Sequence, residues 1–464
     1  MQALPAARPG PDGDSRPGPG SGPSPSPAGA PSPAFIARTR VFAGPGGLPP
    51  RLHLAVTDVT GAADVPQTFG TSWDGPERAR LGSEGEAVER YCGARPPEPS
   101  RMLYASHREL LRRGVPALDP RDLVLHSPRQ YARPGFPFRP FLPDSPAHWV
   151  EGRSAADDRP VHVPAFLVYA AWQRMPHLAP EPLYAFPALG GIASGPSPDF
   201  ALLSGLEEVV ERDAAAVWWA NAHPLPALPL TDRLRPLTRG APRGFEVRLV
   251  RVDNEFGVPV VAAGVRSTDE EWLTYGSAAK ADPADAAAKA LAEAYSLQLT
   301  CRSLDDPSAR PATPGRRSPL KAWRRDRRYL DDYRPDATDV VEQLCQQQLF
   351  LDRRAADRVA PWAWDLPEGR WDEPAVPAYR DAGGLVERVR ATGREVLVVP
   401  LSTRAEAEAG MHVVRVVVPG TVGATPAAYL PLGGDRLRDA AVRLGWRSTP
   451  LAEEELNTFP MPHS

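Results

Sequence analysis

The sequence predicts an α+β fold in which mixed sheets and helices form layers. Residues 245–252 and 258–265 form two apolar-rich runs on either side of a short polar turn, which indicates a strand hairpin. Amphipathic helices are predicted to begin at Pro76, Pro198 and Pro283, since proline at a first helical position loses no hydrogen bond. Hairpins mixed with such helices are typical of the α+β class.

The N-terminal part begins with a segment that is not expected to fold. Residues 1–34 are mostly Pro, Gly, Ser and Ala, and bury too little apolar surface to offset the loss of chain entropy, so we expect a disordered tail. One domain is expected over residues 35–464. Its first elements are predicted as a strand at 51–57, helices at 76–92 and 103–113, and an irregular Pro-rich stretch at 127–160 anchored by Phe136, Phe138 and Phe141.

The remaining elements follow from the same signals. Residues 188–195 (ALGGIASG) are small and glycine-rich, so the backbone there can approach a ligand closely. Ser197 is a good cap for a helix running to about residue 220. The basic stretch 310–328 is interpreted as a solvated loop, or alternatively as a docking strip for an acidic peptide. Further helices are predicted at 283–301, 338–349 and 384–391, and further strands at 395–401 and 412–418.

Composition excludes several classes of protein. A net charge of −3 argues against bulk nucleic-acid binding. No apolar run is long enough to span a membrane, and the N-terminus lacks a secretory signal pattern, so we expect a cytoplasmic protein that does not enter membranes. Three well-separated cysteines form no metal-spaced pair. Lysine occurs only at positions 280, 289 and 321, so a lysine that could bind phosphate is scarce.

Two helical segments carry nearly the same carboxylate motif. Residues 86–90 read EAVER and residues 208–212 read EVVER. Positions three apart lie side by side on a helix, so each motif presents paired carboxylates, and two such faces could meet around one set of metal ions. Mg²⁺ prefers carboxylate oxygens, usually shared with substrate phosphates. The bland alternative is a solvated helix face with a local Glu–Arg pair, which stabilises a helix only slightly.

The usual signatures of other catalytic classes are missing. The chain has no GxxxxGK[ST] phosphate loop, no GxGxxG, no HExxH and no zinc-spaced Cys/His set. Ser194 lacks the GxSxG context of a hydrolase nucleophile. The paired carboxylates therefore predict a nucleotide site of a different kind.

Several blocks, in order, resemble the YcaO superfamily. They are GEAVERYCG (85–93), HWVEGRS (148–154), the long block at 191–219 that contains EEVVERD, DPADAAAKALAEA (282–294) and GMHVVRVVVPG (410–420). The resemblance covers roughly residues 50–464. It implies a YcaO-type fold and an enzyme that binds ATP and Mg²⁺ and activates peptide backbone amides. In azoline-forming members a Cys, Ser or Thr side chain of a ribosomal precursor peptide is cyclised onto the preceding amide.

The resemblance also implies roles for individual residues. Glu86, Glu89, Glu208 and Glu211 match the metal carboxylates. Arg90, Arg212 and Glu293 match further residues of the nucleotide site. The family's Pro-rich C-terminus is thought to shape the active site, and it is represented here by Pro460, Pro462 and His463, which we assign as catalytic.

The chain departs from the family pattern around the nucleotide. Gly82 stands where many members have Ser, the loop 71–75 lacks a common Lys, Gly190 replaces an Asn, and Ser296 replaces a Gln, with Gln298 nearby. These departures leave open a divergent active enzyme, in which Arg or backbone N–H groups bind phosphate, or a protein with weakened nucleotide binding.

The expected activity is cyclodehydration in azole or thiopeptide biosynthesis. The chain is about one YcaO domain long, so a leader-binding E1-like partner is expected, an FMN dehydrogenase could act afterwards, and a homodimer is left open. Two alternatives remain: a YcaO enzyme that makes a thioamide or macroamidine, and a non-catalytic scaffold.

Overall fold

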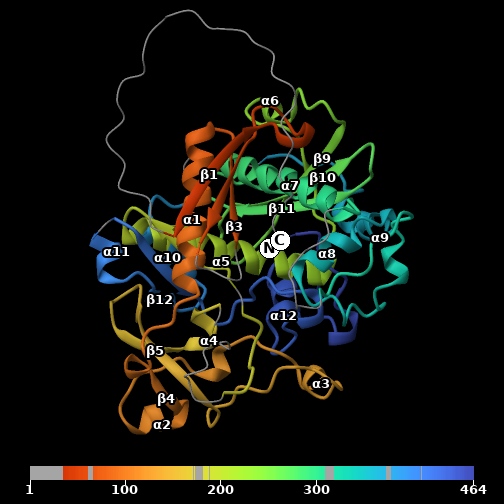
Figure 1. Ribbon diagram of the computed structural model, residues 1–464. Helices are drawn as coiled ribbons and strands as arrows, with labels where there is room; N and C mark the ends of the chain where they lie inside the picture. Colours follow the sequence, from red (N-terminus) through yellow and green to blue (C-terminus); the bar gives the residue numbers. More distant parts are fainter. Residues whose placement is uncertain are drawn as a thin grey trace, which may run out of the picture.

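The computed structural model describes residues 35–60, 66–170, 172, 181–187, 189–308, 318–371, 378–408 and 410–463. Within them, three antiparallel sheets and several long helices form the layers (Figure 1). The prediction of an α+β layered fold is confirmed. The tail predicted to be disordered, residues 1–34, lies outside the described residues.

The first sheet lies beside a helix that carries one carboxylate pair. The strand order is β1-β2-β3, and helix α1 packs against all three strands. A Cβ at Gly70 of β3 would collide with the main chain of α1 at Ser83, so glycine allows this close approach. The bounds are β1 Ile36–Ala43, β2 His53–Val59, β3 Gln67–Ser72 and α1 Pro76–Gly93.

The second sheet has the order β11-β10-β9-β8 and is covered by helix α7. The predicted hairpin is confirmed as β9 and β10, but the strand that follows it, β11, was not predicted. Gly276 lies in the middle of β11, where a Cβ would collide with the carbonyl of Ala290 on α7. The bounds are β8 Ala227–Leu228, β9 Phe245–Arg251, β10 Val260–Ser267, β11 Leu273–Ala279 and α7 Pro283–Asp305.

The third sheet corrects two expectations. The predicted helix 103–113 is a strand followed by a short helix, because Ser106 caps the chain with a capping box. Residues 127–160, expected to be irregular, contain a nine-residue strand with buried Trp149. Phe138 and Phe141 are buried as expected, whereas Phe136 is only half-buried. The order is β4-β5-β12-β13-β7 with β6 beside β5; the bounds are β4 Leu103–Ser106, β5 Pro146–Ser154, β6 Pro160–Pro164, β7 Ile192–Gly195, β12 Leu397–Pro400 and β13 His412–Val417.

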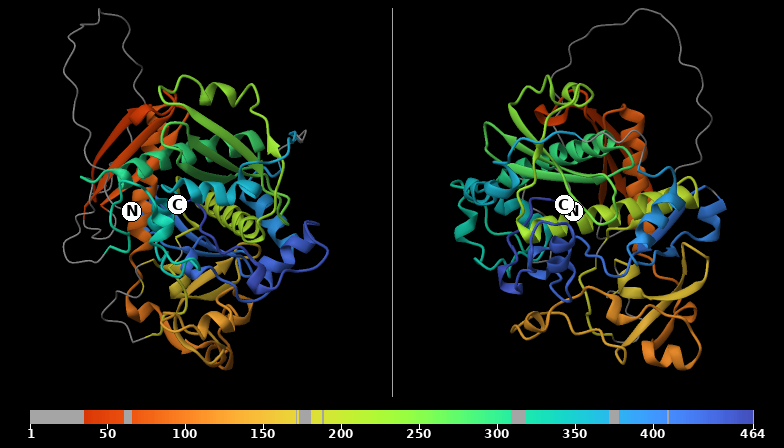
Figure 2. Two further views of the ribbon diagram at one scale, coloured as in Figure 1. Left: turned by 90° about the vertical axis from the view of Figure 1, so that its right-hand side faces the viewer. Right: turned by 180° about the vertical axis from the view of Figure 1, so that it is seen from behind.

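Helix α5, Pro198–Asn221, joins these layers at the centre of the molecule. Ser197 accepts a hydrogen bond from the main-chain N–H of Phe200, which confirms the predicted cap. The helix packs against β13 and β7 and also against β11. The other views place the first two sheets at one end of the molecule and β4–β6 at the opposite end (Figure 2). Since α5 contacts two sheets, most of its faces are buried.

The remaining helices are shorter. Of the predicted helix 338–349 only the second half is helical, whereas the helix predicted at 384–391 is confirmed with a start two residues earlier. The bounds are α2 His107–Arg112, α3 Pro128–Tyr131, α4 Ala165–Val168, α6 Arg235–Thr238, α8 Gln343–Leu349, α9 Arg353–Ala363, α10 Ala382–Ala391, α11 Arg404–Glu408 and α12 Arg436–Arg443. In the described part of the chain, no helix combines the length and apolar character needed to cross a membrane.

Of the basic stretch predicted over 310–328, residues 310–317 lie outside the described residues. In the described part, basic side chains pair with nearby aspartates. Arg324 pairs with Asp326 and Asp332, and Arg327 pairs with Asp305. These contacts favour the interpretation as a solvated loop over a docking strip for an acidic peptide.

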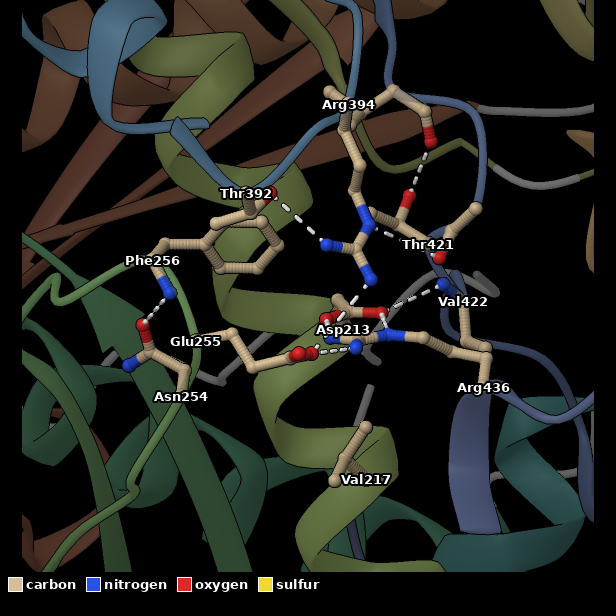
Figure 3. A network of polar contacts seen from close by, with 12 residues as sticks. Asp213, Val217, Asn254, Glu255, Phe256, Thr392, Arg394, Thr421, Val422 and Arg436 are labelled. Carbon is tan, nitrogen blue, oxygen red and sulfur yellow. Dashed lines mark hydrogen bonds and ion pairs between the residues drawn. The ribbon is translucent and has the colours of Figure 1, made fainter. Parts of the chain in front are cut away.

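A buried ionic network fixes α5 to its surroundings (Figure 3). Asp213, which is fully buried, accepts hydrogen bonds from the main-chain N–H of Val422 at 2.9 Å and from Arg436 Nε at 3.0 Å. Arg436 also pairs with Glu255, next to the guanidinium of Arg394. Asp213 directly follows the second carboxylate motif, so the network sets the position of that motif.

Candidate active site

A cleft of about 2500 Å³ runs between α1, α5 and α7. Pockets for small ligands usually occupy about 300–1,000 Å³, so this space exceeds the needs of one nucleotide. All seven residues predicted to bind the cofactor line it: Glu86, Glu89, Arg90, Glu208, Glu211, Arg212 and Glu293. The structure thus brings together carboxylates from three helices that are far apart in the sequence.

The first pair lies on α1. Glu86 accepts a hydrogen bond from the main-chain N–H of Phe69 at 3.1 Å and from Arg90 at 3.0 Å. Glu89 accepts one from the main-chain N–H of Ser194 on β7 at 2.8 Å. Burial raises the pKa of Glu89 to about 8, the Ser194 hydrogen bond opposes this rise, and the nearby carboxylates of Glu208 and Glu86 reinforce it. The α1 carboxylates are therefore anchored from two different sheets.

The second pair lies on α5 and repeats this arrangement. Glu208 accepts a hydrogen bond from the main-chain N–H of Gly191 at 2.9 Å. Glu211 is almost fully buried and accepts one from the hydroxyl of Ser277 on β11 at 2.7 Å. Burial raises the pKa of Glu211 to about 7, although the charge of Arg212 lowers it. Each pair thus has one carboxylate whose ionised form is disfavoured by burial.

These carboxylates fit magnesium chemistry. They supply hard oxygen ligands, and burial disfavours the ionised forms of Glu89 and Glu211, so an added divalent cation would stabilise those forms. Glu86, Glu89, Glu208 and Glu211 would hold the metal, with Glu293 at the facing helix. Bound Mg²⁺ would offset the charge of the phosphates in this site.

The sequence analysis missed one cation of the site. Lys289 lies one turn before Glu293 on α7, with Nζ 3.7 Å from a carboxylate oxygen of Glu293. It lines the cleft, as do Lys280 and Lys321. All three lysines of an otherwise Arg-rich chain therefore face one space, a coincidence that the positions in the sequence alone do not reveal. Lys289 can take the role of the lysine absent from the loop 71–75.

The position of the loop 71–75 supports this role of Lys289. The indole Nε1 of Trp73 donates to the carbonyl of Ala288 at 2.7 Å, which pins the loop to α7 beside Lys289. Gly82 lines the cleft, but the neighbouring Ser83 points away from it and bonds to Thr57 at 2.8 Å. Ser83 therefore does not replace the missing serine.

The structure also shows where the two other departures from the family pattern lie, at Ser296 and Gly190. Ser296 lines the cleft, whereas Gln298 is buried and donates to the carbonyl of Val265 at 3.0 Å. Gln298 therefore makes hydrogen bonds within the protein core and does not line the cleft. Gly190 lines the cleft, while Gly191, with φ of 90°, lies against Val416 of β13. The glycine-rich segment was expected to approach a ligand closely. In the structure, part of it instead approaches the neighbouring strand β13.

The C-terminal tail lies behind the carboxylates. The main-chain N–H of Tyr275 donates to the carbonyl of Pro462 at 2.7 Å, and His463 lies 2.8 Å from Arg212 through Nδ1. Pro460, Pro462 and His463 are buried, and in the described chain none of them contributes to the cleft wall. The structure therefore places these three residues next to the site, behind the residues that form the cleft wall.

Replacing Lys289 by Ala is expected to raise the KM for ATP by about 30-fold, because one charge-assisted contact to phosphate contributes about 2 kcal/mol. Lys289→Arg should restore most of the affinity, since the positive charge is retained. Steady-state kinetics of ATP hydrolysis would measure both variants. An unchanged KM in Lys289→Ala would show that phosphate is bound by other groups.

Comparison with known proteins identifies the family. The family model for the YcaO cyclodehydratase, ATP- and Mg²⁺-binding, matches residues 74–422. The chain belongs to the YcaO family, as the sequence motifs indicated. ATP and Mg²⁺ are the cofactors of this domain, which confirms the expectation from the sequence.

Solved structures share the fold. A heterocyclase in complex with substrate and cofactor has a TM-score of 0.64 and 21% identity, over 92% of this chain and 55% of that chain. The YcaO protein of Methanopyrus kandleri, bound with AMPPCP and Mg²⁺, has a TM-score of 0.53 and 20% identity, over 84% of this chain and 90% of that chain. The E. coli microcin synthetase McbBCD complex with pro-MccB17 bound has a TM-score of 0.51 and 11% identity, over 84% and 89%.

A relative from Methanothermobacter thermautotrophicus is an uncharacterised protein. It is 28% identical over 233 residues, which are 48% of this chain and 55% of that relative. The chain therefore spans only about half the length of this relative and of the heterocyclase. Heterocyclases of this family are enzymes.

Proposed function

We propose that this chain is an ATP-dependent cyclodehydratase that converts Cys, Ser or Thr of a ribosomal precursor peptide to thiazoline or oxazoline. The observation that supports it is the convergence of Glu86, Glu89, Glu208, Glu211 and Glu293 from three helices on one cleft that also holds Arg90, Arg212 and Lys289. Carboxylates for a metal and cations for phosphate are the two needs of a phosphoryl-transfer site.

The proposed chemistry uses phosphate as a leaving group. The side-chain thiol or hydroxyl loses its proton and attacks the preceding amide carbon. The resulting oxyanion takes the γ-phosphoryl group of ATP, and ADP leaves. The oxygen then departs as phosphate when the ring C=N double bond forms with loss of the amide proton. An amide oxygen is otherwise a poor leaving group. Arg90, Arg212 and Lys289 would orient the phosphates and stabilise charge that develops on the transferred group. The volume beyond that of a nucleotide would accommodate the peptide.

We also propose its partners and location. A leader-binding E1-like protein would deliver the precursor, and an FMN dehydrogenase would oxidise azolines to azoles. A homodimer remains compatible with this scheme. Because the reaction uses ATP, we place the protein in the cytoplasm.

The test is ATP turnover together with mass spectrometry of the precursor, with and without the leader-binding partner. The expected result is ATP- and Mg²⁺-dependent loss of water from Cys, Ser or Thr, with fragmentation that locates a ring across one backbone amide. A thioamide or macroamidine in the fragments would assign the chain to another YcaO reaction. Absence of any ATP-dependent change in the assembled complex would favour the scaffold.

Deletion of residues 460–464 is expected to lower ring formation by about 100-fold, because small displacements of groups at a reactive site are costly. The fold should persist, since Trp219 still donates to the carbonyl of Phe459. Stability should nevertheless fall, because Tyr275 loses its bond to Pro462. Circular dichroism and thermal unfolding would check the fold. Full activity of the truncated chain would contradict a role for the tail.

A further inference from the structure

The hydroxyl of Ser277 joins the C-terminal tail to a carboxylate of the site. Ser277 lies on β11 and is fully buried. Its Oγ is 2.7 Å from Glu211 Oε1 and 3.0 Å from His463 Nε2. In the part of the chain that the structure describes, neither Ser277 nor His463 lines the cleft. The tail therefore reaches Glu211 through a buried residue that is not part of the described cleft wall.

The shortest contacts favour one direction for these hydrogen bonds. Arg212 Nη1 lies 2.8 Å from His463 Nδ1 and 3.3 Å from Nε2. A guanidinium can only donate, so with the shorter contact as the hydrogen bond Nδ1 is the acceptor. In the neutral ring Nε2 then carries the proton and donates to Ser277 Oγ, and the Ser277 hydroxyl donates to Glu211. The chain of hydrogen bonds runs from Arg212 through His463 and Ser277 and ends on the carboxylate.

This direction also bears on a metal role for His463. One ligand atom each of Glu211, Glu293 and His463 lie within 4.8 Å of one another, a spacing that could hold a metal ion. A metal needs a ring nitrogen with a lone pair, but Nδ1 accepts from Arg212 and Nε2 carries the proton. In this tautomer His463 makes two hydrogen bonds, and the carboxylates remain as the metal ligands.

We propose that Ser277 is a positioning residue that couples the seating of the C-terminal tail to metal binding at Glu211. This inference rests on the proposed function, which makes Glu211 a metal ligand. The Ser277 and Arg212 contacts are both to Oε1, so Oε2 is the oxygen left for the cation. Hydrogen-bonded partners orient metal ligands in this way. Coupling is reciprocal, so metal binding should hold the tail, and loss of the tail contact should weaken metal binding.

The test uses the purified full-length chain, without precursor, in three forms: wild type, Ser277→Ala and Ser277→Thr. Calorimetry would measure binding of AMPPCP as a function of Mg²⁺. Carboxypeptidase Y with mass spectrometry would follow removal of the last two residues, with and without Mg²⁺ and AMPPCP. In the wild-type protein, Mg²⁺ together with AMPPCP is expected to slow the removal of these two residues.

In Ser277→Ala we expect about tenfold weaker Mg²⁺-dependent binding and loss of the protection. Ser277→Thr should restore both, because it keeps the hydroxyl. If the threonine methyl disturbs packing, His463→Ala and the double variant with Ser277→Ala provide the second test: their effects should not add, since both break one chain of hydrogen bonds.

Unchanged binding and unchanged protection in Ser277→Ala would overturn the inference. Equal losses in Ser277→Ala and a stably folded Ser277→Thr would also overturn it, because the hydroxyl would then not be the cause. By contrast, a wild-type protein that binds no Mg²⁺–AMPPCP would contradict the proposed function itself.

Discussion

Replacing Glu86 by Gln is expected to lower the rate of ATP-dependent ring formation by about 10³-fold. Glu86 is one of the two carboxylates of α1 that face the cleft. The substitution keeps an oxygen for the main-chain N–H of Phe69 but removes the charge that a metal ion needs. A loss of about 4 kcal/mol of electrostatic stabilisation corresponds to this factor. Phosphate release and mass spectrometry of the precursor would measure it.

The matched control is Glu77→Gln on the same helix. Glu77 lies in the first turn of α1, its side chain is 69% exposed, and it pairs with Arg80 outside the cleft. Its substitution should leave ring formation unchanged. Were Glu86→Gln fully active in an assembled complex, this chain would be a scaffold and the catalytic site would lie in another subunit.

Replacing Asp213 by Ala is expected to destabilise the fold by about 3–5 kcal/mol, because it leaves the buried guanidinium of Arg436 without its main partner. Arg436 is 4% exposed, so water cannot replace the lost carboxylate. The main-chain N–H of Val422 also loses its acceptor. Urea unfolding of the isolated chain would measure the change. We further expect a lower kcat, since Asp213 adjoins Arg212.

Two control experiments test whether the loss of stability arises from leaving one buried charge of the Asp213–Arg436 pair without its partner. Asp439→Ala breaks a surface contact with Arg443 and should change stability by less than about 1 kcal/mol. The double variant Asp213→Leu with Arg436→Met removes both charges and should recover much of the loss. Destabilisation by Asp213→Ala no larger than that of Asp439→Ala would show that the network in Figure 3 is not a stabilising anchor.

Helices were predictable where a local signal marks their start. Ser197 and Asp282 cap α5 and α7 with hydrogen bonds to the first turn, and proline follows each of them. The capping box at Ser106 was overlooked, which turned β4 and α2 into one helix. Strand β5 was missed because the surrounding prolines suggested irregular structure, although residues 150–154 alternate between buried and exposed positions.

The candidate site was predictable where the signal is a repeated local spacing. Glu86 with Glu89, and Glu208 with Glu211, each lie three apart on a helix, and the structure places all four on the cleft. Lys289 and Ser277 were missed. Lys289 had a weak signal, its i,i+4 spacing to Glu293. Ser277 had none, because β11 was not predicted and its contacts lie 66 and 186 residues away.

The sequence by itself determined the class of fold, the carboxylate-bearing helices and the family, because these depend on periodicity, capping and motif order along the chain. The tertiary structure decided how the three helices converge, which cations face the cleft, and that His463 lies behind Glu211 instead of in the cleft. These features depend on close approaches permitted at Gly70 and Gly276 and on buried contacts between distant segments. Such contacts leave no local pattern, since the two partners are brought together only by packing.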